Sequence, residues 1–307
     1  MGSGEMHIPD GFLAAPVWGG LCAAAAPAVL LAARRSRKDL DESQVPMMGV
    51  LGAFVFAAQM VNFPLGAGTS GHLLGAALLA STLGLAPAMI VMTAILSLQA
   101  LVFQDGGLLA LGANVFNMAV AGTLAAYWPW RALAGTRFRK LGLFVGGFCS
   151  VLVCAFLGLT ELSVSGVRFG PATLSLALFV FLINAILEGA ITAAVAGSLE
   201  SMRPGWLKAP ASEGRPVLML LLAVSVVLAS AGLLLASTRP DGLERLAAMT
   251  GLASKERTLF AAPLAGYQFS LPGAAWIGKA AAGLTGLVLA VAACIGLARW
   301  FSRWRSA

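Results

Sequence analysis

Repeated apolar stretches, separated by short polar segments, are the feature that most limits how this chain can fold. The hydrocarbon core of a bilayer is about 30 Å thick and takes roughly 17 to 25 helical residues to cross. A backbone in lipid must satisfy its own hydrogen bonds, and no short alternating segments typical of a barrel are visible. The sequence therefore predicts an all-α, polytopic membrane protein with about seven transmembrane helices plus a two-helix C-terminal module. We expect spans near residues 12–33, 47–62, 73–86, 88–103, 110–127, 141–160, 172–199, 217–237 and 274–298.

The composition agrees with a membrane protein, since 59% of the 307 residues are hydrophobic and only 11% are charged. Soluble domains carry about 25% charged residues. The net charge of +7 could indicate a nucleic-acid partner, but Lys and Arg form short clusters between apolar stretches, where they set orientation. We therefore expect the lipid bilayer, and no nucleic acid, as a partner. No basic segment precedes the first stretch, so we expect it to remain in place as a membrane helix.

Residues 73–103 are too long for a single crossing. One helix of that length would reach about 46 Å, and Gly84 and Pro87 offer a break. We therefore expect two helices in this segment.

The distribution of basic residues predicts the orientation. With nine spans and the N-terminus outside, the inner segments hold 14 of the 20 Lys and Arg residues: Arg34, Arg35, Arg37, Lys38, Arg131, Arg137, Arg139, Lys140, Arg203, Lys208, Arg215, Arg299, Arg303 and Arg305. Most of the others lie in one long loop, which translocates regardless of charge. We expect a multi-pass protein of a prokaryotic plasma membrane (an inner membrane), with a cytoplasmic C-terminus.

A Pro-, Gly- and charge-rich segment indicates two modules. This segment, residues 201–216, has the composition of a cytoplasmic linker. It separates a membrane domain, residues 1–200, from a two-span module with an outer loop, residues 217–307.

The chain has only two histidines, and both are expected at the outer side of the membrane. His7 lies in MHIPDGFL, residues 6–13, before the first span, and His72 lies in the glycine-rich NFPLGAGTSGHLLG, residues 62–75. Glycine lets this second segment dip back into the protein. Each histidine alone could be a neutral, hydrogen-bonded interface residue, but the pair favours an ion site. Without a thiolate cluster or converging carboxylates, nickel(II) or cobalt(II) fits such a site best, as transported substrate.

Three blocks carry a family resemblance: residues 6–13, residues 62–75, and QDGGLLALGANVFNMAVAG at 104–122. They resemble the CbiM/NikM family, the substrate-binding membrane components of energy-coupling factor transporters for cobalt and nickel, over roughly residues 6–200. The resemblance implies that the metal is held by the nitrogen of Met6, the backbone and side-chain nitrogens of His7, and the side chain of His72. A free amine at Met6 requires a chain that begins there. We expect translation to start at Met6 and not at Met1, because the Gly, Ser, Gly and Glu at positions 2–5 permit purine-rich codons of the kind expected in a ribosome-binding site.

Other polar residues are candidates for supporting these ligands, because unpaired polar atoms are costly within apolar spans. Glu188 in particular either has a function or bonds Asn, Ser or Thr on neighbouring helices. Asp10 is expected in a turn or as a helix cap before Phe12, not as a ligand, and Gln104 is expected to pair within the protein. The supporting candidates are Asn62, Ser70, Asp105, Asn114, Asn117 and Glu188.

The C-terminal module, with RPDGLER at 239–245, resembles the PDGLE domain, and its layout resembles the NikN/CbiN auxiliary subunits. Asp241 and Glu244 are either turn and cap residues or part of a loop that assists metal loading. No Walker A motif occurs, so the chain is not the ATPase. The resemblance implies a transport subunit, not an enzyme, which works with a transmembrane coupling (T) subunit and ATP-binding cassette subunits.

Two other functions are less well supported. A capture subunit for a vitamin needs aromatic stacking residues, but the chain has only two tyrosines, and an intramembrane metalloenzyme needs a motif such as HExxH. Nickel and cobalt both remain open. Since imidazoles bind metal only when neutral, we expect uptake to weaken as the pH falls through about 6.5.

Overall fold

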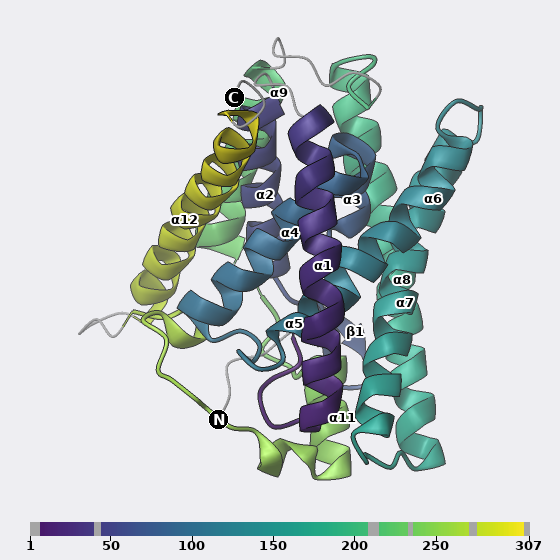
Figure 1. Cartoon of the computed structure of the whole chain (residues 1–307), viewed down its shortest axis with the longest axis vertical. Helices are drawn as coiled ribbons and strands as arrows, with labels where there is room; N and C mark the ends of the chain where they lie inside the picture. Colours follow the sequence, from purple (N-terminus) through teal and green to yellow (C-terminus); the bar gives the residue numbers. More distant parts are fainter. Residues whose placement is uncertain (1–6, 40–43, 208–214, 233–235, 270–274, 304–307) are drawn as a thin grey trace.

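The computed structural model describes residues 7–39, 44–207, 215–232, 236–269 and 275–303, and nearly all regular structure in them is helical. The long helices run roughly side by side along the long axis of the molecule (Figure 1). Most of the bundle is built by α1 (Ala15–Asp39), α2 (Val45–Gln59), α3 (Ala76–Leu83), α4 (Leu85–Leu98), α5 (Leu111–Asn114), α6 (Thr123–Leu133), α7 (Arg139–Val164) and α8 (Pro171–Met202). The C-terminal part adds α9 (Arg215–Val227), α11 (Gly242–Thr250) and α12 (Ala275–Arg303).

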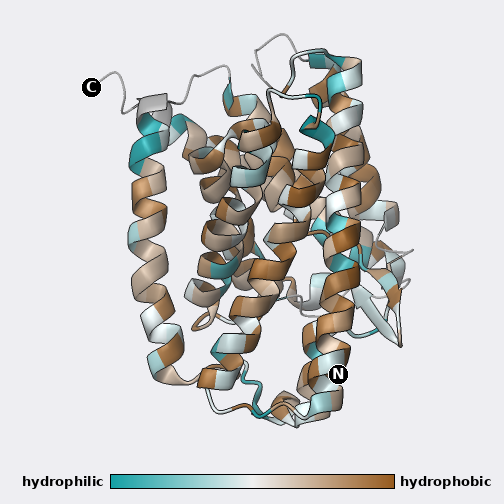
Figure 2. Cartoon of the chain, turned by 90° about the vertical axis from the view of Figure 1, so that its right-hand side faces the viewer, coloured by the Kyte–Doolittle hydropathy of each residue, from teal (hydrophilic) through white to brown (hydrophobic). Residues whose placement is uncertain are grey.

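The described helices confirm the predicted all-α membrane class. Six of them are long and apolar enough to cross a membrane: Ala15–Arg37, Leu85–Phe103, Arg139–Val164, Pro171–Met202, Arg215–Gly232 and Trp276–Trp300. Their middle sections are hydrophobic, while hydrophilic residues gather toward the ends (Figure 2). Large apolar side chains point outward, among them Phe156 at 70% exposure. Lipid tails are the surroundings in which such a surface is stable.

Short π-helical turns extend several of these helices. The turn η2 (Gln99–Phe103) continues α4, η3 (Val115–Gly122) joins α5 to α6, and η4 (Leu228–Gly232) continues α9. Single π turns inside helices occur frequently at functional sites. Here η3 carries Asn117 and Met118, and η2 ends just before Asp105.

The break expected between residues 73 and 103 lies at Gly84, whose φ of 83° ends α3 and precedes α4. Pro87 falls in the first turn of α4, where proline is tolerated. However, α3 is shorter than the expected span near 73–86. Its eight residues reach about 12 Å, which is less than half of a hydrocarbon core.

Irregular chain stands before α3, where a longer helix was expected. A two-stranded antiparallel hairpin, β1 (Phe63–Gly66) and β2 (Thr69–Gly71), follows α2. Residues 72–75 then connect β2 to α3. The amides of Leu74 and Gly75 bond to Glu188, in the middle of α8. The segment that contains His72 therefore enters the bundle to about half its depth, as its glycine content suggested.

Small residues set the closest helix contacts. On α7, a β-carbon at Gly147 would come within 2.8 Å of the backbone of Gly189 on α8, so these helices touch through their main chains. The C-terminal module packs in the same way. On α2, a β-carbon at Gly52 would lie 2.6 Å from Cys294 of α12. Such contacts are typical of helix packing in membranes.

The segment between α9 and α12 closes one end of the bundle. It contains α11, η5 (Leu252–Lys255) and η6 (Ala265–Tyr267), and it passes beneath the start of α1 in the view of Figure 1. Backbone hydrogen bonds fasten it to the first module. Leu264 donates to Val102, Arg257 donates to Asp10, and Ser237 donates to the carbonyl of Asn62.

Candidate metal site

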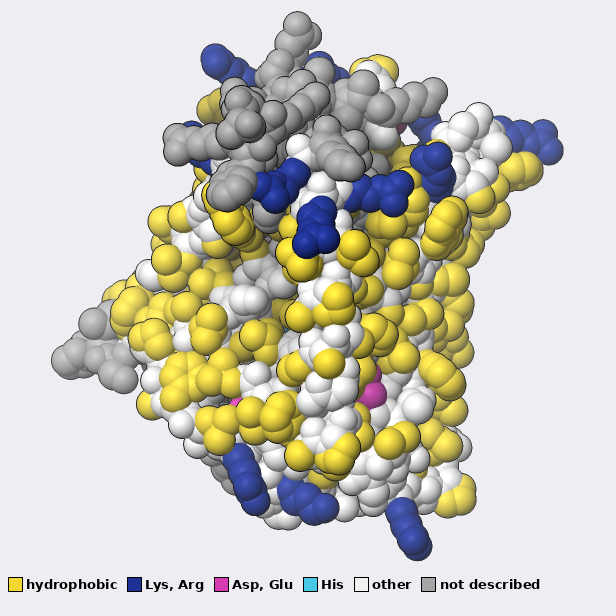
Figure 3. Space-filling model, viewed as in Figure 1, with side chains coloured by type: hydrophobic (Ala, Val, Ile, Leu, Met, Phe, Trp, Pro, Cys, Tyr) yellow, Lys and Arg dark blue, Asp and Glu magenta, His cyan; other side chains and the backbone are white. Residues whose placement is uncertain are grey.

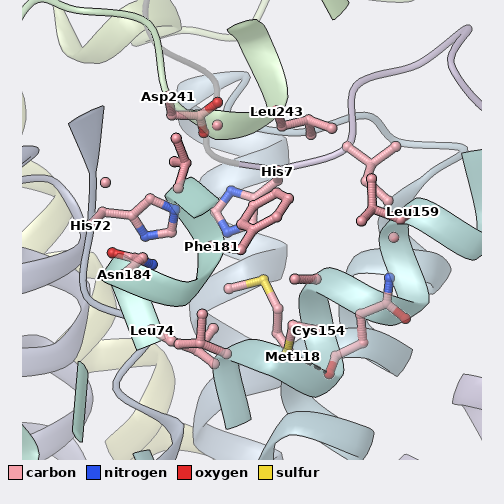
Figure 4. A pocket seen from close by; sticks show the side chains of 18 of the residues that line it. His7, His72, Leu74, Met118, Cys154, Leu159, Phe181, Asn184, Asp241 and Leu243 are labelled. Atoms are coloured by element: carbon pink, nitrogen blue, oxygen red, sulfur yellow. Dashed lines mark hydrogen bonds between the residues drawn. The ribbon is translucent and has the colours of Figure 1, made fainter. Parts of the chain in front are cut away.

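His7 and His72 line one pocket at the end of the bundle that the C-terminal segment covers. The pocket lies among the N-terminal segment, the chain after β2, η3, α7, α8 and the start of α11. The two imidazoles lie side by side, with Asp241 on one side and the sulfur atoms of Met118 and Cys154 on the other (Figure 4). Their ring centroids are 6.3 Å apart, and the ring planes are inclined at 49°.

His7 is almost fully buried and is oriented by a carboxylate. Its Nδ1 lies 3.0 Å from Oδ1 of Asp105. Because an ionised carboxylate can only accept, Nδ1 carries a proton, and in the neutral imidazole the lone pair is then on Nε2. No hydrogen bond to this buried Nε2 occurs within the described part of the chain. A neutral imidazole held in this way is the form that binds transition metals.

His72 is held in the same tautomer by the backbone. Its Nδ1 donates to the carbonyl of Leu73 at 3.2 Å, so its Nε2 also keeps a lone pair. Burial, and then the neighbouring His7, lower the pKa of His72 to about 4. The imidazole is therefore neutral across the physiological pH range.

The distance between the rings suits an ion held by both. Metal–nitrogen bonds of about 2.0 to 2.1 Å leave the centroids of two such imidazoles at most about 6 to 7 Å apart. Within the described residues, no group of three or more His, Cys, Asp or Glu side chains could hold a metal. Any further ligands would come from other groups, and Met6, expected to supply one, lies outside the described residues.

The N-terminal segment is held in place just after His7. The amide of Asn114 bonds both backbone groups of Ile8: its Oδ1 accepts from the nitrogen, and its Nδ2 donates to the carbonyl, each at 3.0 Å. Asp10 accepts hydrogen bonds from three consecutive amides, those of residues 108–110. Asp10 is therefore a cap, but it caps the turn before α5 and not the helix that follows Phe12.

A second cluster of polar groups lies beside the pocket. Asn117 donates to Glu161 on α7 at 2.9 Å, and the thiol of Cys154 donates to the carbonyl of Asn117 at 3.1 Å. Asn117 and Cys154 line the pocket, as does Asn184 of α8. The Oδ1 atoms of Asn117 and Asn184 are buried and accept no hydrogen bond from the described part of the protein.

Glu188 does not line the pocket but holds the chain behind His72. Its two carboxylate oxygens accept from the amides of Leu74 and Gly75, at 2.7 and 2.9 Å. These amides begin α3, and the start of a helix attracts negative charge. Of the two roles expected for Glu188, the observed contacts match structural support, with backbone amides as the partners instead of side chains.

The remaining supporting candidates bond mainly to the C-terminal segment. Ser70 donates to the carbonyls of Arg239 and Pro240. Gln104 bonds Thr258 and the amide of Ala262, and Asn62 accepts from Ser237. Asn62 and Gln104 do not line the pocket around His7 and His72.

Asp241 is both a helix cap and a wall of the pocket. It forms a capping box with Glu244 at the start of α11, and its carboxyl group lines the pocket beside the histidines. Burial, and then the Glu244 carboxylate, raise the pKa of Asp241 to about 8. The expected cap role is thus observed for both residues.

Three residues of this region had not been singled out from the sequence: Tyr267, Glu161 and Asn184. Glu161 carried the same signal as Glu188, a carboxylate within an apolar stretch, and could have been found. Tyr267 donates to Asp105 at 2.5 Å across 162 positions of sequence, and no local pattern indicates such a contact.

Comparison with known proteins identifies two matching family models. Residues 7–206 match the cobalt uptake substrate-specific transmembrane region (CbiM), and residues 215–303 match the PDGLE domain. The chain is 33% identical to a protein from Archaeoglobus fulgidus described as a fused nickel transport protein, NikMN, over 96% of this chain and 99% of that protein. It is 35% identical to the cobalt transport protein CbiM of Geobacter sulfurreducens, over 73% of this chain and 70% of that protein.

A solved structure is similar as well. It is described as a crystal structure of a truncated transition metal transporter, and it superposes with a TM-score of 0.57 at 35% sequence identity. The match covers 64% of this chain and 99% of the solved one.

Proposed function

The chain belongs to the CbiM/NikM family of nickel and cobalt transport membrane proteins and carries a C-terminal PDGLE domain, and from this we propose how it works. It is the substrate-capture subunit of an energy-coupling factor transporter. It binds nickel(II) or cobalt(II) from the outer face and releases the ion inward. Its ligands are the imidazoles of His7 and His72 and the nitrogen of Met6. The backbone nitrogen of His7, which the resemblance also implies, does not fit this set, because a histidine chelates through its own backbone nitrogen only together with Nδ1, and Nδ1 of His7 bonds Asp105.

The proposal is carried by the position of the two imidazoles, which lie next to each other in one pocket. They come from positions 65 residues apart and lie with centroids 6.3 Å apart in one pocket. An oxygen accepts from Nδ1 of each ring, so both Nε2 atoms keep lone pairs. Two imidazole nitrogens suit nickel and cobalt, and no group of three or more His, Cys, Asp or Glu side chains among the described residues offers a different ligand set. A transition-metal ion of borderline softness, such as nickel(II) or cobalt(II), is therefore the substrate class that this pocket favours.

The charge distribution supports a pocket on the outer side. Figure 3 shows most of the Lys and Arg residues of the visible face at the end opposite the pocket. Arg34, Arg35 and Arg37 form the last turns of α1 there. Short basic segments remain on the cytoplasmic side, so the N-terminus, the histidines and α11 face outward.

Energy must be supplied by other chains, because the sequence has no Walker A motif. We assign this supply to ATP-binding cassette subunits, joined through a transmembrane coupling subunit. In this arrangement residues 1–200 form the capture domain, and residues 217–307 form a module that covers its outer end.

Uptake of radiolabelled nickel and cobalt by cells that express the whole transporter tests the proposal. Replacing either histidine, as H7A or H72A, removes one of two imidazole ligands and should lower uptake at limiting metal at least about tenfold. The matched control is S163A, since Ser163 is exposed near the outer end of α7 and does not line the pocket. Uptake of both metals at the wild-type rate by H7A and H72A, at equal protein levels, would refute the proposal.

A further inference from the structure

A hydrogen bond from the C-terminal module leads, through Asp105, to His7, one of the proposed ligands. The hydroxyl of Tyr267 donates to Oδ2 of Asp105, whose other oxygen accepts from Nδ1 of His7. We propose that Tyr267 is a positioning residue for metal binding: through Asp105 it fixes the His7 ring with Nε2 available to the ion. The inference rests on the proposed function, and it extends the binding machinery to a residue outside the capture domain.

The carboxylate of Asp105 is fixed because its two oxygens have different partners. Asp105 is 3% exposed, in the turn that follows η2. Tyr267 holds Oδ2, which sets the rotation of the carboxylate and so places Oδ1 against His7. Groups that orient a metal-binding histidine determine both its tautomer and its ring direction. Removing the hydroxyl takes away one of these two constraints.

The tyrosine is held in place independently of that hydrogen bond. Its ring stacks on Phe103, with centroids 4.6 Å apart and an interplanar angle of 17°. Its backbone nitrogen donates to Leu264, whose own nitrogen donates to Val102 of the first module. Phe103 and Val102 both belong to η2, the turn that leads into Asp105. Tyr267 and Asp105 are thus positioned by the same piece of backbone.

The backbone at this position is unusual for a side-chain-bearing residue. Tyr267 has φ of 56° and follows Gly266 with φ of 64°, both in the left-handed region. A non-glycine residue there is strained, and such strain is concentrated at functional sites, where the surrounding contacts maintain it. Here the conformation turns the ring onto Phe103 and the hydroxyl toward Asp105.

The test is equilibrium binding of Ni²⁺ and Co²⁺ to the purified full chain, combined with the absorption spectrum of bound Co²⁺. Y267F removes only the hydroxyl and keeps the stacked ring, and we expect it to bind about tenfold more weakly with a shifted Co²⁺ spectrum. The control is Y127F, which removes the chain's other tyrosine hydroxyl, a partner of Arg131 far from the pocket. We expect its affinity and spectrum to match the wild type.

A double-mutant cycle separates positioning from general stability. If Tyr267 acts through Asp105, Y267F should have no further effect on affinity in a D105A background. Wild-type affinity and spectrum for Y267F would overturn the inference, and so would an equal loss in both backgrounds. If Y267F does not fold, para-methylphenylalanine at position 267 keeps the bulk of the side chain without the donor.

The same assay distinguishes the two proposals. H7A and H72A are measured alongside Y267F. Wild-type binding by both histidine variants would refute the proposed function itself. Loss of binding in those variants together with an unchanged Y267F would refute only the role of Tyr267.

Discussion

At the scale of single residues, burial changes the chemistry expected of His72. The sequence alone suggested a metal site that weakens near pH 6.5, the ordinary pKa of histidine. In the folded protein, burial and the adjacent His7 lower the pKa of His72 to about 4. The His72 imidazole therefore remains a competent ligand through pH 5, and its protonation does not limit capture near neutral pH.

This shift predicts how the metal-free protein responds to acid. Between pH 6.5 and about 4, unfolded chains bind a proton at His72 that folded chains do not. The folded state therefore loses at most about 3 kcal/mol of stability as the pH falls through this range. The imidazole NMR signals of metal-free protein, assigned by comparison with H7Q, should show a His72 midpoint near 4. A midpoint at 6.5 would contradict the burial described here. H72Q should lose this part of the acid sensitivity.

A second prediction at this scale concerns Asn114, which bonds both backbone groups of Ile8. N114A leaves a buried amide and a buried carbonyl next to His7 without these partners. Each costs about 1 to 3 kcal/mol when unpaired, so the thermal midpoint should fall and metal should bind more weakly. N114D retains the acceptor for the Ile8 amide and should lie between N114A and the wild type. If N114A and the wild type have the same thermal midpoint in calorimetry and the same metal affinity in titration, these two hydrogen bonds do not hold the segment in place.

At the scale of elements, α3 is a half-length helix whose start is held by a carboxylate from α8. E188A leaves the amides of Leu74 and Gly75 without their acceptors. We expect thermal unfolding in detergent to begin roughly 5 to 10 °C lower and metal affinity to fall, because His72 lies just before these amides. E188Q keeps one acceptor oxygen and should give an intermediate midpoint. A midpoint equal to the wild type in E188A would show that α3 does not depend on this cap.

The sequence was sufficient for features that depend on local pattern. Apolar length predicted the long helices, and the break at Gly84 followed from the residue that permits a φ of 83°. Glycine content predicted that the segment around His72 enters the bundle. The short length of α3 could not be predicted, because Glu188 sets its start from 114 positions away. The contact of Tyr267 with Asp105 likewise depends on how the second module docks.

At the scale of the whole molecule, the two matched regions behave as one packed unit with two kinds of contact. In the membrane, α12 lies against α2 through glycine, and at the outer end the segment 236–269 bonds to the chain around the pocket. Ser70, two positions before His72, donates to Arg239 and Pro240. The C-terminal module therefore contributes to the walls of the metal pocket as well as to the bundle.

This packing predicts that the two regions assemble without a covalent link. Residues 1–207 and 215–307, co-expressed as separate chains, should copurify in mild detergent, because the contacts above do not involve residues 208–214. G52L should abolish copurification, since a β-carbon at Gly52 would already lie 2.6 Å from Cys294 and such overlap forces the helices apart. The control is G19L on α1, where a β-carbon meets nothing within 4 Å. Chains that elute separately when neither carries a substitution would show that the linker, not the interface, holds the modules together.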